Sequence, residues 1–538
     1  MSSKYIFVTG GVVSSLGKGI IAASIGKLLQ ARGFRVTIQK FDPYINIDPG
    51  TLNPYEHGEC YVTTDGVETD LDLGHYERFT DIRTTRHNSI TTGRIYKTVI
   101  DRERHGDYLG RTIQVVPHIT DEIKRRMLRE DGEDEDFDFV ITEVGGTIGD
   151  IESAPFMEAI RQLRWQLGQG AVCVHLTYVP YLRAADELKT KPTQHSVKEM
   201  QGMGIQPDVL VLRTERHLDD GLRGKVASFC NVDLECVVQC EDMPSIYEVP
   251  VSMQRQGLDA AILRKMGIAV GETPAMAPWH VFLEKQHGAK QEVHVALVGK
   301  YDLQDAYKSI RESLNLAGIY NGVRTVIHFV NSEGLTQACV ADRLDGVAGI
   351  VICPGFGRRG IEGKVVAAEY ARTHDIPAFG ICLGMQMMVV EFARNVLGYD
   401  NANSSEMDSQ TPHNVIDMME NQKAVTQMGG TMRLGAYDCE LAENSRAYEA
   451  YGQVSFIRER HRHRYEFNNA YREAFERAGM KCVGINPTAN LVEIVEIPSL
   501  RWYIGTQFHP EYTSTVLHPH PLFMSFFKAC VRYGTVKA

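Results

Sequence analysis

The 538-residue sequence lacks any apolar run that approaches the length needed to span a bilayer, which argues against an integral membrane protein. It also lacks an excess of basic residues, because 68 Asp and Glu outnumber 57 Lys and Arg and leave a net charge of −11. The net negative charge therefore does not favour electrostatic binding to nucleic acid or to an anionic membrane. We expect no signal peptide, since the first residues lead directly into an apolar strand pattern.

The eleven cysteines follow no regular framework. Cys230, Cys236 and Cys240 cluster, but they have neither CxxC spacing nor histidines nearby. We therefore expect no zinc site there, and the reduced thiols of a cytoplasmic protein are the better interpretation. Hydrophobic residues make up 43% and charged residues 23% of the chain, which is typical of a globular protein. The length favours more than one domain.

Two successive α/β patterns organise the chain. Short apolar runs typical of buried parallel strands alternate with segments of helical periodicity, so we predict an α/β fold class with two doubly wound parallel-sheet domains. The expected strands cover residues 5–8, 36–40, 139–142, 171–177, 209–212 and 235–239 in the first half, and 293–299, 326–329, 349–353 and 378–382 in the second. Gly, Pro and polar residues over 271–291 predict a linker between domains 1–270 and 292–538.

Residues 10–19 form a glycine-rich turn between the first expected strand and a helix. Backbone N–H groups and the helix N-terminus in such a turn face an anion, and Lys18 would reach the outer phosphates of a nucleotide. The motif is not a strict Walker A, because one extra residue precedes Gly17, and Gly19 stands where Ser or Thr would bind magnesium. A glycine-rich turn with an exposed lysine remains the alternative.

Carboxylates must hold the metal if the loop has no hydroxyl ligand. Glu143 follows a buried strand and precedes two glycines, which is the position of a Walker B carboxylate, so we favour it as a ligand of Mg²⁺. Asp72 lies at a second expected strand end, where chemistry alone leaves the metal role undecided. A cap or a surface carboxylate is the alternative for both.

Two further segments combine groups that suit a nucleotide. Residues 189–194 offer two cations, two hydroxyls and an amide in a turn broken by Pro192, which suits a triphosphate. Residues 145–152 offer backbone donors and two carboxylates, which suit ribose hydroxyls. For each segment a polar loop is the alternative.

Cys382 ends an apolar run and is followed by Gly384 and helix-compatible residues, so we expect its sulfur at the apex of a strand–turn–helix. His509 and Glu511 follow another strand pattern far downstream. A cysteine, a histidine that takes its proton and a glutamate that orients the imidazole together make a nucleophilic triad. These residues resemble the class I glutamine amidotransferases, which release ammonia from glutamine. A buried structural cysteine is the alternative.

Taken in order, the motifs resemble the CTP synthase family from end to end. The most specific part is the stretch 42–54, accompanied by 10–19, 56–59, 189–194 and the glutaminase motifs. The resemblance implies that ATP phosphorylates O4 of UTP, with Mg²⁺ bound by Asp72 and Glu143. Ammonia from glutamine would then displace the phosphate and give CTP.

The resemblance also implies binding roles for the matching positions. ATP would be bound by Ser15, Leu16, Gly17, Lys18, Gly19, Ile20, Lys40, Asp72, Glu241, Asp242 and Met243, with Arg213 as a weaker candidate. UTP and the inhibitory product CTP would be bound by Ser14, Asp150, Ile151, Glu152, Lys189, Thr190, Lys191, Pro192, Thr193, Gln194 and Lys225. Glutamine would be bound by Gly355, Leu383, Gly384, Met385, Gln386, Glu406 and Arg464. Backbone N–H groups near Gly355 and Leu383 would hold the oxyanion.

Regulation and assembly are implied in the same way. GTP would act as an allosteric effector through a lid at residues 354–360, which has one glycine fewer than the family pattern between Pro354 and Phe356. That difference leaves the strength of GTP activation open. An ammonia tunnel would be gated near His57, where Cys60 replaces the valine of many relatives with a side chain of similar size. The resemblance also implies that the chain forms a homotetramer, and many members of the family form filaments as well.

Two competing interpretations differ in their predictions. Another P-loop synthetase fused to a glutaminase, such as a cobyrinic acid amidating enzyme, would share the phosphate loop and the triad, but not residues 42–54 or 189–194. A non-enzymatic, filament-forming relative of the partition ATPases would not need the set of Cys382, His509 and Glu511.

Overall fold

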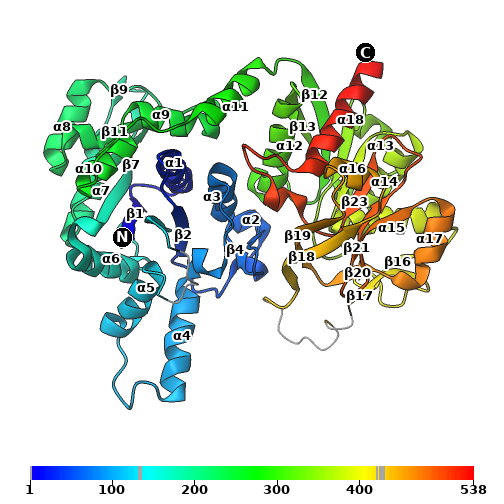
Figure 1. Ribbon diagram of the computed structural model, residues 1–538, viewed down its shortest axis with the longest axis horizontal. Coiled ribbons are helices and arrows are strands. Elements are labelled where there is room, and N and C mark those ends of the chain that lie inside the picture. Colours follow the sequence, from blue (N-terminus) through cyan, green and yellow to red (C-terminus); the bar gives the residue numbers. More distant parts are fainter. Residues whose placement is uncertain (1–2, 131–135, 420–421, 423–429, 538) are drawn as a thin grey trace. The chain divides into compact units, whose positions relative to one another are not determined.

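A computed structural model describes residues 3–130, 136–419, 422 and 430–537, and the chain divides into two compact units. Unit 1 comprises Met1–Asp48 and Asp72–His280, and unit 2 comprises Pro49–Leu71 and Val281–Ala538. Each unit is built around one large open sheet (Figure 1). Within the described residues, no helix is both long enough and apolar enough to cross a membrane.

Unit 1 alternates strands with helices along the chain. Its strands are β1 Lys4–Gly10, β2 Val36–Asp42, β5 Ser89–Thr91, β6 Phe139–Val144, β7 Ala171–Val179, β10 Val209–Thr214 and β11 Val237–Glu241, with a small hairpin of β8 Tyr181–Leu182 and β9 Glu187–Leu188. Its helices are α1 Lys18–Ala31, α3 Asp72–Thr80, α4 Thr92–His105, α5 Thr120–Met127, α6 Ala154–Leu167, α7 Lys191–Gly202, α8 Asp220–Cys230, α9 Val249–Arg255 and α10 Leu258–Lys265. Helix α11 Ala277–Gly288 runs across the boundary between the units.

The main sheet of unit 1 is parallel, in the order β11-β10-β7-β1-β6-β2-β5. Both of its faces are covered. Tyr5 and Phe7 belong to an apolar cluster with residues of α5 and α6, whereas Ile38 and Ile141 lie against Gly26 of α1. The doubly wound sheet predicted for the first half is confirmed. Because β1 lies between β6 and β7, the loops that follow these three strands meet at one carboxyl edge, where such folds bind ligands.

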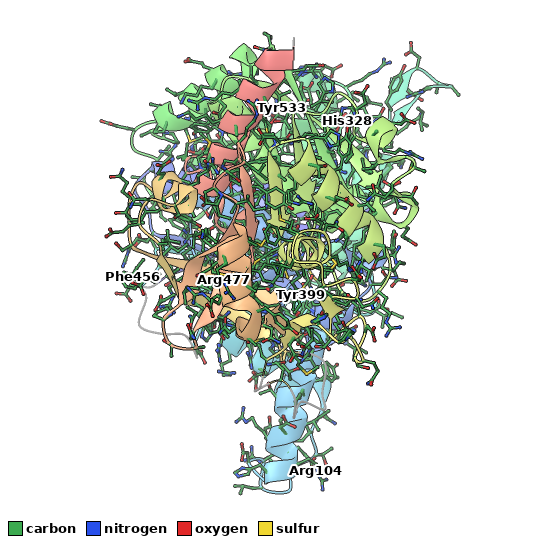
Figure 2. All side chains as sticks on the ribbon, turned by 90° about the vertical axis from the view of Figure 1, so that its right-hand side faces the viewer. Arg104, His328, Tyr399, Phe456, Arg477 and Tyr533 are labelled. Carbon is green, nitrogen blue, oxygen red and sulfur yellow. The ribbon has the colours of Figure 1, made fainter. Side chains whose placement is uncertain are left out.

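Helix α4 projects from the body of unit 1, with Arg104 at its outer end (Figure 2). Its N-terminus is capped by Thr91, whose side chain accepts a hydrogen bond from the N–H of Arg94. It ends at Gly106, whose φ of 91° suits the left-handed termination common at helix C-termini.

Unit 2 contains a mixed sheet in the order β13-β12-β14-β15-β23-β22-β21-β18-β19. Its strands are β12 Glu292–Gly299, β13 Arg324–Asn331, β14 Gly349–Ile352, β15 Ala378–Ile381, β18 Arg433–Leu441, β19 Phe456–His463, β21 Lys481–Asn486, β22 Leu491–Glu496 and β23 Tyr503–Thr506. Smaller sheets are formed by β3 Tyr61–Val62 with β4 Glu68–Thr69, and by β16 Asn403–Ser404, β17 Asn414–Met418 and β20 Tyr465–Phe467. Its helices are α2 Pro54–His57, α12 Lys308–Tyr320, α13 Val340–Arg343, α14 Ile361–Thr373, α15 Leu383–Asn395, α16 Arg446–Ala450, α17 Arg472–Ala478 and α18 Pro521–Lys537.

The predicted parallel core of unit 2 is confirmed from β13 to β23. Beyond β23 the sheet continues with strands that pair antiparallel, and these were not predicted. In β19, for example, the charged residues Glu459 and Arg460 are adjacent, so this strand lacks the continuous apolar run of a doubly buried strand.

The predicted domain boundaries differ from the two units in two respects. The segment Pro49–Leu71 groups with unit 2 through contacts such as the hydrogen bond that Tyr61 donates to the carbonyl of Tyr512, at 2.7 Å. Within the predicted linker, most residues after 276 form helix α11. The strand expected at 235–239 also begins later, at Val237, because residues 234–236 form a 3₁₀ turn.

Candidate active sites

The glycine-rich turn leads from β1 into α1 as predicted. Helix α1 begins at Lys18 after Gly17, whose φ of 89° is in the left-handed region that glycine adopts without strain. Lys18 folds back over the turn and donates a hydrogen bond to the carbonyl of Gly146 at 2.6 Å. Burial lowers the pKa of Lys18, although the nearby Glu143 carboxylate acts in the opposite direction. The Lys18 ammonium is therefore held beside the glycine-rich turn, where a phosphate can reach it.

A cluster of carboxylates surrounds Lys40 beside this turn. The ammonium of Lys40 lies 3.1 Å from Glu143 Oε1 and 3.7 Å from Asp42 Oδ1, and it also contacts Asp72. Tyr76 donates a hydrogen bond to the second oxygen of Glu143. Burial opposes the charge of Lys40, but the three carboxylates outweigh it and raise its pKa well above the usual value.

The two predicted metal ligands, Asp72 and Glu143, are brought together. Asp72 is the first residue of helix α3, so its predicted place at a strand end was wrong, whereas Glu143 lies in β6 as expected. Burial raises the pKa of Asp72, but the Lys40 ammonium outweighs burial and lowers it overall. Burial raises the pKa of Glu143, and the negative charge of Asp72 raises it further. The Lys40 ammonium lowers this pKa, but it does not outweigh the other two effects.

Gly19 explains why the turn carries no hydroxyl ligand. A Cβ atom at Gly19 would lie 2.5 Å from Asp72 Oδ1 and 3.4 Å from Glu143 Oε2, so the space of a Ser or Thr side chain is filled by carboxylates.

No cluster of three or more His, Cys, Asp or Glu side chains suited to a metal occurs in the described part of the chain. Two carboxylates beside a phosphate loop fit Mg²⁺, which is typically bound by one or two carboxylates together with substrate phosphates.

Residues 191–194 of the segment form the first turn of helix α7, where Pro192 is well placed, whereas Lys189 and Thr190 precede the helix. Thr193 is fixed against β7 by hydrogen bonds to Thr177 at 3.0 Å and to the carbonyl of Tyr178 at 3.1 Å. Lys189 pairs with Glu187 in the adjoining hairpin. Both lysines of the segment therefore lie near the carboxyl edge of the sheet, at the N-terminal end of a helix.

The other predicted nucleotide ligands are spread around this edge. The loop after β6 is joined to the phosphate loop by a hydrogen bond from the N–H of Ile148 to the carbonyl of Gly10, at 2.8 Å. Its Asp150 accepts a hydrogen bond from the N–H of Thr147 at 2.7 Å. Arg213 pairs with Asp242 at 2.6 Å, and a Cβ atom at Gly17 would lie 3.9 Å from that guanidinium. The structure therefore brings Arg213 and Asp242 close to the phosphate loop. Lys225 is exposed on α8.

Cys382 occupies the predicted strand–turn–helix in unit 2. Strand β15 ends at Ile381, Cys382 has φ 52° and ψ −106°, and helix α15 follows at once. The glycines on either side permit this sharp turn. A Cβ atom at Gly380 would lie 2.3 Å from the sulfur of Met388, and one at Gly384 would lie 1.9 Å from the carbonyl oxygen of Ile352. A strained turn of this kind presents a nucleophile at the end of a sheet.

His509 and Glu511 follow the neighbouring strand β23, which pairs parallel with β15. His509 Nδ1 and Glu511 Oε1 are 2.7 Å apart, and both side chains are buried. Burial would lower the pKa of His509, but the charges of Glu511 and Cys382 outweigh it and raise it to about 10. Glu511 therefore fixes the orientation of the imidazole, whose Nε2 makes no hydrogen bond within the described residues and is free to accept a proton.

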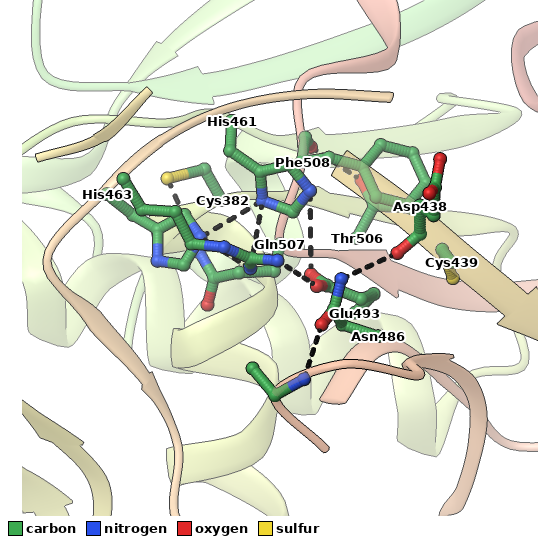
Figure 3. Close-up of polar contacts among 12 residues, drawn as sticks. Cys382, Asp438, Cys439, His461, His463, Asn486, Glu493, Thr506, Gln507 and Phe508 are labelled. Atoms are coloured by element: carbon green, nitrogen blue, oxygen red, sulfur yellow. Dashed lines mark hydrogen bonds and ion pairs between the residues drawn. The ribbon is translucent and has the colours of Figure 1, made fainter. Parts of the chain in front are cut away.

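Sequence reasoning missed one group that contacts the sulfur, Gln507, and it did not foresee that the predicted residue Gln386 would bond to it. Gln507 Nε2 donates a hydrogen bond to Cys382 Sγ at 3.6 Å, and Gln386 in turn donates to Gln507 Oε1 at 3.1 Å. Figure 3 shows Gln507 next to Cys382, with His461 and His463 nearby. The position of Gln507 two residues before His509 was the only signal in the sequence, and nothing in it identified the contact with sulfur.

The predicted lid is held from both sides. Gly357 donates its N–H to Glu406 Oε1 at 2.7 Å, and Lys300 donates to the carbonyls of Phe356 and Gly357, the latter at 3.2 Å. Burial lowers the pKa of Lys300 to about 8. Gly355 has φ 152°, and a Cβ atom there would lie 2.9 Å from Lys300 Cε and 3.6 Å from Leu383 Cδ2. Gly355 and Leu383 are therefore close together, as the oxyanion prediction requires.

Glu406 and Arg464, the two charged residues predicted to bind glutamine, already have partners in the chain. One oxygen of Glu406 accepts from Gly357, and burial raises its pKa. Arg464 donates to Gln422 Oε1 and to Thr431 Oγ1, both at 2.7 Å. These contacts fix the orientation of both side chains.

Comparison with known proteins gives a consistent result. The family model described as CTP synthase N-terminus matches residues 4–268, and the model described as glutamine amidotransferase class-I matches residues 302–529. A protein named CTP synthase from Bacteroides thetaiotaomicron is 71% identical over 531 residues, which are 98% of this chain and 98% of that protein. Proteins of the same name from Bacteroides fragilis and Porphyromonas gingivalis are 69% and 64% identical, each over 98% of this chain and at least 98% of their own length.

Proposed function

The chain belongs to the CTP synthase family, and we propose that it divides the family's reaction between the sites of its two units. It is a ligase that aminates UTP to CTP with ATP, using nitrogen released from glutamine. The observation that carries the division of labour is the presence, in one chain, of a phosphate loop beside two carboxylates and of a cysteine at a sharp turn beside a buried His509–Glu511 pair.

The synthetase reaction belongs to unit 1 in this proposal. The turn at 15–20 holds the phosphates of ATP, Lys18 and Lys40 neutralise the transferring phosphoryl group, and residues 241–243 lie at the adenine. Asp72 and Glu143 would hold Mg²⁺, which neutralises phosphate charge when bound. Phosphoryl transfer depends mainly on positioning and charge neutralisation, which this arrangement of cations and carboxylates can supply.

UTP occupies the other side of the same edge in this proposal. Its triphosphate is bound by Ser14, by residues 189–194 and by Lys225, and the product CTP shares these contacts. Residues 150–152 meet the ribose or base of CTP, which gives feedback inhibition at an overlapping site. Support comes from the hydrogen bond between Ile148 and Gly10, which joins the 145–152 loop to the phosphate loop.

Glutamine hydrolysis belongs to unit 2. Cys382 attacks the side-chain amide of glutamine, and the thiol proton passes to His509, which Glu511 holds in the required orientation. N–H groups of Gly355 and Leu383 stabilise the oxyanion. Residues 383–386, Glu406 and Arg464 bind the substrate. The proton on His509 then goes to the leaving ammonia, and water releases glutamate from the thioester.

Regulation, assembly and location complete the proposal. GTP activates glutamine hydrolysis through the 354–360 lid, and the active form is a homotetramer, with filaments as a further assembly. The reaction takes place in the cytoplasm, where thiols stay reduced. That location is supported by the eleven cysteines, all of which are free.

The test is UTP amination with ATP and Mg²⁺, followed by the ultraviolet change from uracil to cytosine. Ammonia and glutamine serve as alternative nitrogen sources, each with and without GTP. We expect CTP from both sources, and we expect Cys382→Ala to abolish only the glutamine-dependent reaction. CTP from ammonia alone in the wild type would refute the glutaminase assignment, and no CTP from either source would refute the whole proposal.

A further inference from the structure

One buried histidine connects the phosphate loop to the helix at the proposed UTP site. His175 of β7 shares a 2.8 Å hydrogen bond through Nδ1 with Thr9 Oγ1, and a second 2.8 Å bond through Nε2 with Ser196 Oγ. Thr9 is in β1, one residue before the glycine-rich turn, and Ser196 is in the second turn of α7. Thr9, His175 and Ser196 are 1%, 0% and 6% exposed, so water does not compete for these bonds.

The phosphate loop lies directly on this chain of hydrogen bonds. A Cβ atom at Gly11 would lie 1.7 Å from Ser196 Oγ and 3.2 Å from His175 Nε2. The backbone of the loop can therefore approach α7 this closely only because residue 11 is glycine. Helix α7 begins at Lys191, within the 189–194 segment and five residues before Ser196.

Burial favours the neutral ring, and two hydroxyl partners suit that form. Burial, assisted by the charge of Lys18, lowers the pKa of His175 to about 3. A neutral imidazole has one N–H donor and one acceptor nitrogen, and a hydroxyl can act as either. Thr9 and Ser196 therefore satisfy both nitrogens, and the three side chains form a continuous chain of hydrogen bonds from β1 to α7.

We propose that Thr9, His175 and Ser196 are positioning residues that set the distance between the phosphate loop and helix α7, and thereby the approach of UTP O4 to the γ-phosphate of ATP. This inference rests on the proposed function, which puts the two nucleotides on either side of that junction. Phosphoryl transfer is especially sensitive to such a distance, because positioning supplies most of the catalysis. Each nucleotide binds its own half of the site, so breaking the chain should slow the transfer more than it weakens binding.

The test uses variants that remove one hydroxyl each with little change in volume, Thr9→Val and Ser196→Ala, in the full-length enzyme. We measure kcat of ammonia-dependent CTP synthesis, the Kd of UTP and the Kd of a non-hydrolysable ATP analogue. We expect kcat to fall by about 10-fold to 100-fold, the range for a misplacement of about 1 Å. Each Kd should change less than about threefold, and the double variant should be no slower than the slower single variant. Thr9→Ser, which keeps the hydroxyl, should restore kcat.

A matched control comes from the same strand and helix. Thr177 of β7 bonds to Thr193 of α7 at 3.0 Å, also fully buried, but Thr177 makes no hydrogen bond to β1 within the described residues. Thr177→Val therefore removes a comparable β7–α7 contact without touching the link to the phosphate loop. We expect it to lower the melting temperature about as much as Ser196→Ala while leaving kcat within about threefold. Because Thr177 holds Thr193 of the proposed UTP site, its effect on the reaction should appear in the Kd of UTP and not in kcat.

The outcomes separate the two proposals. A wild type that makes no CTP overturns both. A wild type that makes CTP while Thr9→Val and Ser196→Ala keep full kcat overturns the positioning role alone. That role is equally overturned if Thr177→Val slows the reaction as much as Ser196→Ala, or if the loss appears entirely in the Kd values.

Discussion

The side-chain amide of Gln507 donates a hydrogen bond to the sulfur of Cys382 across 3.6 Å, inside a fully buried environment. The donor is itself fixed, because Gln386 donates to the oxygen of the same amide and also to the carbonyl of Tyr465 at 2.9 Å. A fixed N–H aimed at the sulfur can stabilise negative charge that develops there during attack, because hydrogen bonds to charged groups are the stronger ones.

We predict that Gln507→Leu slows alkylation of Cys382 by iodoacetamide at neutral pH by about tenfold, the effect of losing one hydrogen bond to a charged group. Glutamine-dependent CTP synthesis should fall in parallel, and ammonia-dependent synthesis should not change. The alkylation rate is measured by mass spectrometry of the Cys382 peptide, with Cys382→Ala as the blank. An unchanged alkylation rate would refute the role of Gln507.

The Glu511 carboxylate is the strongest influence that raises the pKa of His509, to about 10 against the lowering effect of burial. We predict that Glu511→Gln lowers this pKa and reduces glutamine hydrolysis by about 10²-fold to 10⁴-fold, as expected when the imidazole loses its orienting carboxylate. The measurement is the pH profile of kcat/KM for glutamine. Hydrolysis within a few-fold of the wild type would contradict this assignment.

The same pair predicts a stability change with a definite sign. Because the pKa of His509 is raised above its unfolded value of 6.5, its contribution to the free energy of unfolding is complete below pH 6.5 and is lost as pH rises through about 10. The melting temperature of the wild type should therefore exceed that of Glu511→Gln most below pH 6.5, and the gap should narrow toward pH 10. A gap that widens with pH would show that the raised pKa is wrong.

The sequence was sufficient for the elements whose signals are local. The turn at Cys382 was predictable because Gly380 and Gly384 flank it, and the parallel strands were predictable because each is a short apolar run. Groups whose roles come from distant contacts were not predictable. Gln507 and Cys382 are 125 positions apart, and His175 meets both Thr9 and Ser196 only after the sheet has formed. The grouping of residues 49–71 with unit 2 depends on equally distant contacts.

Lys300 clamps the lid through two backbone carbonyls, and its own side chain is buried. We predict that Lys300→Met raises the KM for glutamine by roughly tenfold. The two lid carbonyls would lose their hydrogen-bond donor, and about 1–2 kcal/mol of the free energy that holds the lid in place would be lost. Ammonia-dependent synthesis should stay within about twofold. Lys290→Met, at an exposed position, is the control for loss of charge. An unchanged KM would mean that the contact of Gly357 with Glu406 holds the lid without Lys300.

Gly19 allows the sharpest test of the metal assignment, because Gly19→Ser restores the hydroxyl of a standard Walker A motif. If the turn bound magnesium as a standard Walker A motif does, this substitution would leave the activity unchanged or raise it. Here the added Cβ would lie 2.5 Å from Asp72 Oδ1, so Asp72 and the start of α3 must move. We predict that ammonia-dependent CTP synthesis falls by about 100-fold, the cost of misplacing a group at a phosphoryl-transfer site by about 1 Å, whereas glutamine hydrolysis continues. Activity retained in Gly19→Ser would show that a hydroxyl can replace Asp72, and the assignment of Asp72 as a ligand would be lost.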